Sequence, residues 1–138
     1  MALVLDASVA LSWLFADEFT PDTESLLHRV VDEKVVVPGH WKAEVANGAL
    51  TGERRGRVSH ERTSAWILQL GDLDLESDRH GTDAALSAIL PLARSRRLTI
   101  YDALYLELAE RRGMPLATFD ADLAAAARSV GIEVLGAL

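Results

Sequence analysis

The stretch LVLDAS, residues 3–8, decides what fold to expect of the chain. Its three apolar residues form a run long enough for a short buried strand, and Asp6 stands where that strand should end. The residues from Val9 to Phe15 then have the composition of a helix. Ligands of an open parallel sheet bind outside the carboxyl ends of its strands. Asp6 is therefore a carboxylate in the position of a binding group.

The composition is that of a soluble globular domain. The chain has 138 residues, of which 49% are hydrophobic and 25% charged, and this length favours a single domain over residues 1–138. It has no cysteine, which excludes disulfides, thiolate zinc sites and cysteine nucleophiles. We see neither a secretory leader nor an apolar run of about 20 residues. We therefore expect a cytoplasmic protein that has no membrane partner.

The net charge of −7 argues against non-specific binding of nucleic acid. Two features weaken that argument. The basic residues are almost all arginine, whose guanidinium group suits phosphate and guanine better than an ammonium group does. In addition, acidic residues that gather around a divalent metal ion are largely neutralised when the ion is bound.

Apolar runs and helical patterns alternate along the chain, which predicts an α/β fold with a central parallel sheet. Strands are expected at residues 3–5, 35–37, 72–76, 115–118 and 132–135, the third as an edge strand. Helices are expected at residues 9–15, 21–31, 40–50, 60–70, 82–97, 99–112 and 122–130. Pro91 should kink or divide the fifth of these helices. Residues 51–57 are expected to form a charged loop or a frayed helix end.

Four carboxylates lie beside the junctions of predicted strands and helices. They follow the first strand, lie on the helix after the second strand, lie in the first turn of a late helix, and follow the fourth strand. We call them the four junction acids: Asp6, Glu44, Asp102 and Asp120. Asp122 is a near neighbour and a possible fifth member.

Each of the last three junction acids also has a purely structural interpretation. Asp102 follows Thr99 by three residues, the spacing of a capping box. Asp120 is placed to cap the alanine-rich helix that follows it. Glu44 is placed to be a solvated acid on its helix. Asp6 is the hardest of the four to explain in this way, because it follows directly on a buried strand.

Taken together, the four junction acids favour a cation site. Two carboxylates about 5 Å apart repel each other by roughly 3 kcal/mol at an effective dielectric of 20. A cluster of them therefore needs raised pKa values or a bound cation. Oxygen ligands without histidine or cysteine select hard ions such as Mg²⁺ or Mn²⁺, which act on phosphates. The chemistry that this predicts is phosphoryl or phosphodiester transfer.

Four segments carry a resemblance to a known family. They are LDAS at residues 5–8, EVANGAL at residues 44–50, TIYDALY at residues 99–105 and LATFD at residues 116–120. In this order and spacing they resemble a PIN domain, and more specifically the VapC toxins of bacterial and archaeal toxin–antitoxin pairs. The resemblance implies a PIN-like three-layer α/β/α fold and a Mg²⁺- or Mn²⁺-dependent endoribonuclease that cleaves RNA. It also implies a homodimer and inhibition by a VapB-like antitoxin encoded beside it.

The resemblance implies a role for each junction acid. Asp6 and Asp102 would be primary metal ligands, directly or through water. Glu44 and Asp120 would complete the site or orient the attacking water. Asp122 is close enough to Asp120 to share its role or to replace it.

Other residues are candidates for accessory roles. Ser8 is expected either to hydrogen-bond a carboxylate or a phosphate oxygen, or to cap the first helix. Arg54, Arg55 and Arg57 are expected either to contact RNA phosphates or to lie in solvent at a helix C-terminus. Tyr101 is expected to pack rather than to contact substrate. We expect His28, His40, His60 and His80 at the surface, and Trp13, Trp41 and Trp66 in the core or a dimer interface.

Other function classes fit the sequence less well. A receiver domain needs an acidic pair after the first strand and a late lysine, but the only lysines are Lys34 and Lys42. A haloacid-dehalogenase-type phosphatase needs Asp-x-Asp, and here Ser8 stands at the second position. Two alternatives within the fold stay open. One is a PIN-fold nuclease outside a toxin–antitoxin pair, and the other is an inert PIN-fold module that only binds RNA or protein.

Overall fold

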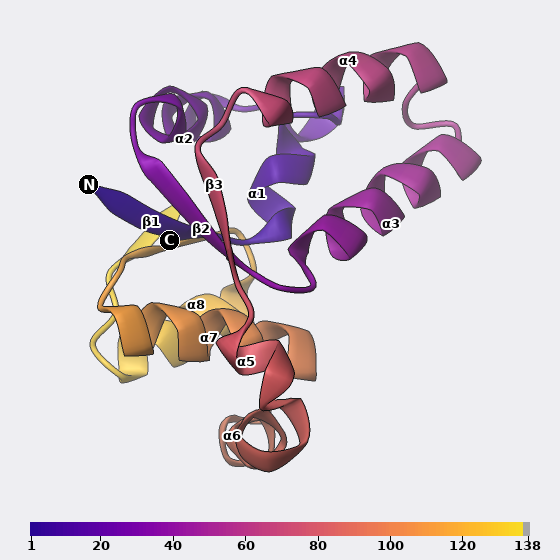
Figure 1. The fold of residues 1–138 in the computed structure, drawn as a ribbon. Coiled ribbons are helices and arrows are strands. Elements are labelled where there is room, and N and C mark those ends of the chain that lie inside the picture. The colour runs from indigo at the N-terminus through magenta and orange to yellow at the C-terminus, as the bar shows by residue number, and fades with distance from the viewer. Residues whose placement is uncertain (137–138) are drawn as a thin grey trace.

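Five parallel strands form the central sheet in the order β3-β2-β1-β4-β5 (Figure 1). The structure, a computed structural model, describes residues 1–136, so residues 137 and 138 of the predicted domain lie outside the described part. Strand β1 is central, and its residues 3–5 are fully buried, as the opening stretch predicts. The strands are β1 (Ala2–Leu5), β2 (Lys34–Pro38), β3 (Leu75–Asp78), β4 (Leu116–Thr118) and β5 (Val134–Gly136).

Eight α-helices cover the two faces of the sheet in the described part of the chain. They are α1 (Ala7–Ser12), α2 (Pro21–Val31), α3 (Trp41–Arg54), α4 (His60–Gly71), α5 (His80–Asp83), α6 (Leu90–Arg96), α7 (Ile100–Arg112) and α8 (Ala121–Ser129). Figure 1 shows α1 to α4 on one side of the sheet and α5 to α8 on the other. The predicted α/β/α architecture is confirmed. Among residues 1–136 we find no helix with the length and hydrophobicity needed to span a bilayer.

Several helix boundaries follow from the capping residues that the sequence contains. The side chain of Thr20 accepts a hydrogen bond from the Thr23 amide, and that of Ser59 accepts one from the Arg62 amide. Helix α7 ends at Gly113, whose φ of 63° is easily adopted only by glycine. The three tryptophans, Trp13, Trp41 and Trp66, are buried in the core as predicted.

Several boundaries differ from the prediction, and the predicted division of the helix that contains Pro91 is confirmed. Helix α1 begins at Ala7, directly after Asp6, and not at Val9. Helix α3 continues to Arg54, so only the last part of the predicted charged loop is non-helical. Strand β3 is an edge strand, but it begins at Leu75. The predicted helix of residues 82–97 is divided into α5, a π-helical turn and α6, and Pro91 stands in the first turn of α6.

Helices α1 and α3 approach each other closely because glycine lies at their contact. A Cβ atom on Gly48 would come within 2.5 Å of a Leu11 methyl carbon, and one on Gly52 within 2.3 Å of the Phe15 ring. Glu44 precedes Gly48 by one helical turn, so it lies on the same side of α3. The close approach therefore brings Glu44 toward the start of α1 and Asp6.

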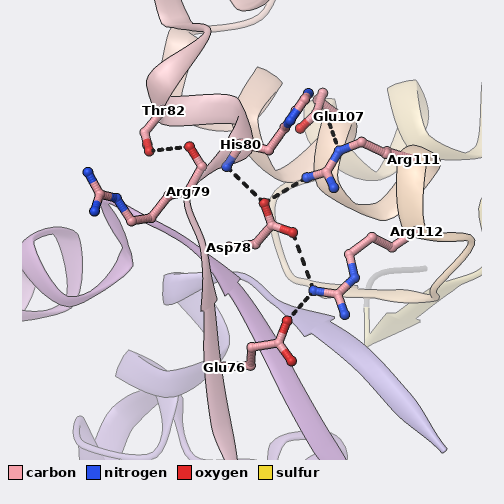
Figure 2. Close-up of polar contacts among 8 residues, drawn as sticks. All are labelled: Glu76, Asp78, Arg79, His80, Thr82, Glu107, Arg111 and Arg112. Atoms are coloured by element: carbon pink, nitrogen blue, oxygen red, sulfur yellow. Dashed lines mark hydrogen bonds and ion pairs between the residues drawn. The ribbon is translucent and has the colours of Figure 1, made fainter.

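A network of charged side chains joins the edge strand β3 to the end of α7 (Figure 2). Arg111 donates a hydrogen bond of 2.7 Å to Asp78, and Arg112 bridges Asp78 and Glu76. Lys34 of β2 pairs with the same Glu76. Burial raises the pKa of Asp78, but the hydrogen bonds from Arg111 and the His80 amide, together with the arginine charges, lower it below its ordinary value. The network holds α7, which carries Asp102, against the sheet.

Candidate active site

Asp6 is a buried carboxylate at the carboxyl end of the central strand. Its side chain is held by two hydroxyl groups, because Ser8 Oγ and Thr118 Oγ1 each donate a hydrogen bond of 2.7 Å to Asp6 Oδ2. Burial raises the pKa of Asp6, the two hydroxyl bonds oppose this effect, and the nearby charge of Glu44 adds to it. The pKa of Asp6 therefore lies above its ordinary value.

Ser8 hydrogen-bonds a carboxylate, as one of its two predicted roles requires. The alternative role as a helix cap is wrong, because Asp6 stands at the N-cap position of α1 and Ser8 is the second residue of the helix. Ser8 Oγ also accepts a long hydrogen bond of 3.4 Å from the Phe119 amide. Ser8 thus links the carboxyl ends of β1 and β4, where Asp6 and Asp120 lie.

Glu44 is fixed by two partners. Its Oε1 accepts a hydrogen bond of 2.7 Å from the hydroxyl of Tyr105 and lies 3.0 Å from His40 Nε2. The hydroxyl of Tyr105 in turn accepts one of 3.2 Å from the amide of Ala7, the residue after Asp6. Burial raises the pKa of Glu44, but the bonds and the charge of His40 bring it below the ordinary value. The interpretation of Glu44 as a freely solvated helix acid is wrong.

The charges of all the other predicted acids act on the carboxyl group of Asp102. The side-chain oxygen of Thr99 accepts a hydrogen bond of 3.1 Å from the Asp102 amide. The predicted helix cap therefore exists, and it uses the backbone of Asp102 and not its carboxyl group. The Asp102 carboxyl group faces the other acids. Its pKa is raised to about 6, by burial first and then by the charges of the other acids. In decreasing order of effect these are Asp120, Asp6, Glu44 and Asp122.

Asp120 has both a structural and an electrostatic role. It is the N-cap of α8, and its Oδ1 accepts a hydrogen bond of 2.8 Å from the Leu123 amide, so the predicted capping is confirmed. Its own amide donates to Thr118 Oγ1 at 3.0 Å, which connects it to the hydroxyl that holds Asp6. Asp122 is exposed, and its charge affects Asp102 less than that of Asp120 does.

Three residues of this arrangement were missed by sequence reasoning: His40, Tyr105 and Thr118. His40 was expected at the surface, but its side chain is only 13% exposed and its ring packs against two tyrosines. Helical spacing offered a signal for two of them, because His40 precedes Glu44 by four residues and Tyr105 follows Asp102 by three. The other histidines, His28, His60 and His80, are exposed as predicted.

The three arginines that were expected either to contact RNA phosphates or to lie in solvent are exposed at the end of α3 and just after it. Arg57 pairs with Asp17 at 3.1 Å and Glu18 at 2.6 Å, and its guanidinium lies 4.1 Å from the centre of the Phe15 ring. Arg54 and Arg55 form no ion pair with another described residue. A groove of about 320 Å³ lies between α1 and α3, and the residues that line it include Arg55, Arg57 and Ser8. The groove thus joins the arginines to Ser8, whose hydroxyl is hydrogen-bonded to Asp6.

The donor atoms of this site suit a hard divalent cation held partly through water. The four junction acids offer only carboxylate oxygens, and their mutual repulsion raises the pKa of Asp102, which a cation would relieve. Within residues 1–136, no three Asp, Glu or His side chains come close enough together to hold a metal ion by themselves. Mg²⁺ usually keeps several waters and takes only one or two protein carboxylates. The charge and the donor type therefore fit such an ion.

The fold and the position of the acids define a class, namely three-layer α/β domains with carboxylates at the carboxyl edge of a parallel sheet. Within this class, the sequence profile of the PIN domain matches residues 3–129. The chain belongs to the PIN domain family, as the four sequence segments indicated.

Individual relatives agree with this assignment. The chain is 35% identical over 127 residues to the ribonuclease VapC3 of Mycobacterium tuberculosis, a match that covers 90% of this chain and 86% of the relative. Among solved structures, PAE2754 from Pyrobaculum aerophilum superposes with a TM-score of 0.70 at 24% identity, covering 97% of this chain and 83% of the other. VapBC2 from Rickettsia felis, solved with a promoter DNA fragment, superposes with a TM-score of 0.66 at 12% identity, covering 97% of both chains. These two structures support the fold.

Proposed function

We propose that this protein is a Mg²⁺- or Mn²⁺-dependent endoribonuclease and the toxin of a toxin–antitoxin pair. One observation carries the nuclease proposal. The carboxyl group of Asp102 is surrounded by the charges of the other three junction acids, which come from different elements of the fold. The similarity to ribonuclease VapC3 over nearly the whole chain supports the same function. We propose Asp6, Glu44, Asp102 and Asp120 as the residues that carry it.

In this proposal the residues of the chain hold the site in place before substrate binds. A bound divalent cation would supply a more acidic water and neutralise charge on the phosphate. Ser8 and Thr118 keep the Asp6 carboxylate in one orientation, and Tyr105 and His40 do the same for Glu44. Fixed ligands avoid the cost of reorganisation during the reaction.

RNA would approach along the groove between α1 and α3. This groove leads from the arginines after α3 to Ser8, which is bonded to Asp6. Arg55 has no described carboxylate partner and is the arginine best placed to bind phosphate there. Arg57 is engaged by Asp17 and Glu18, so it would have to exchange these partners for phosphate.

A protein partner is part of the proposal. An apolar groove of about 640 Å³ lies between α3 and α4, with Leu50 and Ile67 among the side chains that line it. These two side chains are 42% and 56% exposed, and a covering protein would remove them from water. We propose that a VapB-like antitoxin inhibits the enzyme and that the toxin forms a homodimer. The solved VapBC2 structure of Rickettsia felis supports the existence of such complexes for proteins of this fold.

Product analysis tests the nuclease proposal. Purified protein is incubated with a mixed RNA pool and Mg²⁺, and the cleaved ends are sequenced. Because water attacks the phosphorus in the proposed reaction, the products carry no 2′,3′-cyclic phosphate. A substrate with a 2′-deoxy sugar at the cleaved position is expected to remain cleavable. Cyclic phosphate products, or no cleavage of any RNA, would contradict the proposal.

Expression in cells distinguishes the toxin from the two alternatives. Growth arrest by the wild-type chain, relieved by co-expression of the neighbouring gene, is expected of a toxin. Cleavage in the test tube without growth arrest would indicate a PIN-fold nuclease outside a toxin–antitoxin pair. RNA or protein binding with no cleavage in Mg²⁺ or Mn²⁺ would indicate an inert binding module.

A further inference from the structure

An exposed tyrosine stands beside the four junction acids. Tyr101 directly precedes Asp102, and it packs against His40 as predicted, but its side chain stays 59% exposed. Ligand-binding pockets are commonly lined by aromatic side chains together with a few polar groups. The four junction acids do not explain why the ring of Tyr101 is exposed beside them.

Tyr101 is the outer member of a stack of three rings. The buried ring of Tyr105 meets His40 edge-on, with ring centres 5.3 Å apart and planes at 70°. His40 meets Tyr101 at the same centre distance, with planes at 34°. Hydrogen bonds to Glu44 fix the inner two rings. The stack thus runs from the core to solvent and offers one aromatic ring for a further planar group.

A small pocket adjoins this ring. It has a volume of about 260 Å³ and is lined by His40, Ala43, Glu44, Asn47 and Tyr101. Asn47 follows Glu44 by three residues on α3, so it lies on the same helix face one turn further. Its exposed amide group provides two donors and an acceptor for hydrogen bonds. The pocket combines an aromatic ring with an adaptable polar side chain and contains no lysine or arginine, and its histidine, His40, is paired with Glu44.

We propose that this pocket binds one unpaired nucleobase of the RNA substrate, stacked on Tyr101 and hydrogen-bonded by Asn47. This inference rests on the proposed ribonuclease function and deepens it by naming what is recognised beside the cleaved bond. The carboxylate of Glu44, which already pairs with His40, and the lack of a lysine or arginine disfavour a phosphate in this pocket, whereas a base is neutral. Sequence-specific proteins bind unpaired bases of RNA by stacking on aromatic side chains and by hydrogen bonds to base edges.

The proposal defines where the substrate must be single-stranded. The pocket includes Glu44, so the bound base belongs to a nucleotide next to the cleaved phosphate. A paired base has its hydrogen-bonding edge occupied and its faces stacked on neighbours. The enzyme is therefore expected to cut within loops or unpaired ends of RNA and not within continuous duplexes.

Binding of fluorescent single-stranded oligoribonucleotides tests the pocket separately from cleavage. The anisotropy measurement uses the full chain with Asp6→Asn in Mg²⁺, so that the RNA is not consumed. Base–aromatic stacking is worth about 1–3 kcal/mol, so adding Tyr101→Leu is expected to weaken binding by about 5- to 150-fold. Tyr101→Trp retains a stacking surface and is expected to bind within about threefold of its parent. Leu86→Ala, at a side chain that is 87% exposed, is the surface control.

A scan with abasic nucleotides locates the bound base. One abasic position is expected to weaken binding by the same factor as Tyr101→Leu, and to have no further effect in that variant. Asn47→Ala is expected to change the base preferred at this position alone. Equal binding by Tyr101→Leu and its parent, or an abasic effect independent of Tyr101, would overturn the inference. A Tyr101→Leu variant that binds RNA normally but no longer binds a protein partner would also overturn it.

The result is separable from the proposed function. If wild-type protein cleaves no RNA in Mg²⁺, the ribonuclease proposal fails whatever the anisotropy shows. If it cleaves RNA while Tyr101→Leu has unchanged binding, KM and kcat, only the nucleobase pocket is wrong. Thermal melting of each variant checks that it is folded, and Tyr101→Trp provides a second test if Tyr101→Leu does not fold.

Discussion

At the scale of single residues, the pKa of Asp102 is affected by the charge of every other acid of the site. Its pKa in the folded protein is raised to about 6 from an ordinary value of 3.8, by burial and by the neighbouring acids. The folded state therefore holds this proton more tightly than the unfolded state does. The resulting stabilisation is fully present below pH 3.8 and is lost as the pH rises through about 6.

We predict that Asp102→Asn stabilises the metal-free protein at pH 8, by at most about 3 kcal/mol, because two pKa units correspond to about that free energy. The stability of the variant is also expected to fall less between pH 4 and pH 7 than that of the wild type. Urea unfolding in EDTA across this pH range measures both effects. Addition of Mg²⁺ at pH 8 should stabilise the wild type more than the variant. An identical pH dependence in the two proteins would show that Asp102 does not feel the other acids.

Tyr105 links three elements of the site through one hydroxyl group. This hydroxyl accepts from the Ala7 amide and donates to Glu44. Burial raises the pKa of Tyr105 far above its ordinary value, so the proton that it donates to Glu44 is retained. Its removal leaves one buried amide and one carboxylate oxygen without this partner.

We predict that Tyr105→Phe lowers the free energy of unfolding by about 1–3 kcal/mol, the cost of unsatisfied buried groups. Because Glu44 also loses its orientation, Mn²⁺ affinity measured by titration calorimetry should fall by about 10- to 100-fold. Ser95→Ala serves as the control, since that exposed hydroxyl bonds only to the carbonyl of Leu92 on its own helix. Unchanged Mn²⁺ affinity in Tyr105→Phe would mean that the hydroxyl does not position Glu44.

Sequence reasoning recovered the acids better than the groups that hold them. The four junction acids stand out because each is a charge beside a strand–helix junction, and the charges of the other three act on Asp102 in the folded chain. Thr118, Tyr105 and His40 carry no such signal, since a threonine in a strand and an aromatic residue in a helix are ordinary. Their importance comes from contacts between residues as far apart as Asp6 and Thr118.

At the scale of elements, the contact of α1 with α3 determines where Glu44 lies. Gly52 is buried against the ring of Phe15, and an added Cβ atom would come within 2.3 Å of one ring carbon and 2.6 Å of the next. Arg57 covers the same ring. The ring therefore has little freedom to move away.

We predict that Gly52→Ala destabilises the protein by about 1–2 kcal/mol. Overpacking typically costs about 1–3 kcal/mol, and the better helix propensity of alanine returns up to about 1 kcal/mol. Gly71→Ala in α4 is the matched control, because no atom lies within 4 Å of its added Cβ, and it should be neutral or stabilising. Urea unfolding measures both changes. Equal stabilisation by the two substitutions would contradict the close contact of Gly52 with the Phe15 ring, which follows α1.

Capping residues and prolines allowed most elements to be predicted. Thr20, Ser59 and Gly113 act at the helix ends where the sequence places them. The extension of α3 to Arg54 agrees with the frayed-helix-end alternative for residues 51–57. Glycine and charged residues alone could not distinguish it from a loop, because the packing of the Phe15 ring on Gly52 cannot be read from the sequence. The division of the helix near Pro91 was predicted, but the π-helical form of the turn before it was not.

At the scale of the whole molecule, charge connects the fold to its proposed function. The chain carries a net charge of −7, and part of this excess is concentrated where four elements meet at the carboxyl edge of the sheet. A divalent cation would convert this edge from one that repels RNA into one that binds its phosphate. The exposed ring of Tyr101 lies next to Asp102, and the groove that is lined by Arg55 and Arg57 also includes Ser8.

The central claim is that the acids around Asp6 form a metal-dependent ribonuclease site, and the Mg²⁺ dependence of RNA cleavage tests it most directly. Wild type and Asp6→Asn are compared in EDTA and across a Mg²⁺ titration. Asparagine can still accept the hydrogen bonds of Ser8 and Thr118, so the variant is expected to fold and melt like the wild type. We predict no cleavage in EDTA, cleavage by the wild type once Mg²⁺ is in excess, and a loss in Asp6→Asn beyond the ~100-fold typical of an outer-shell partner. Full activity of folded Asp6→Asn, or cleavage by the wild type in EDTA, would contradict the account.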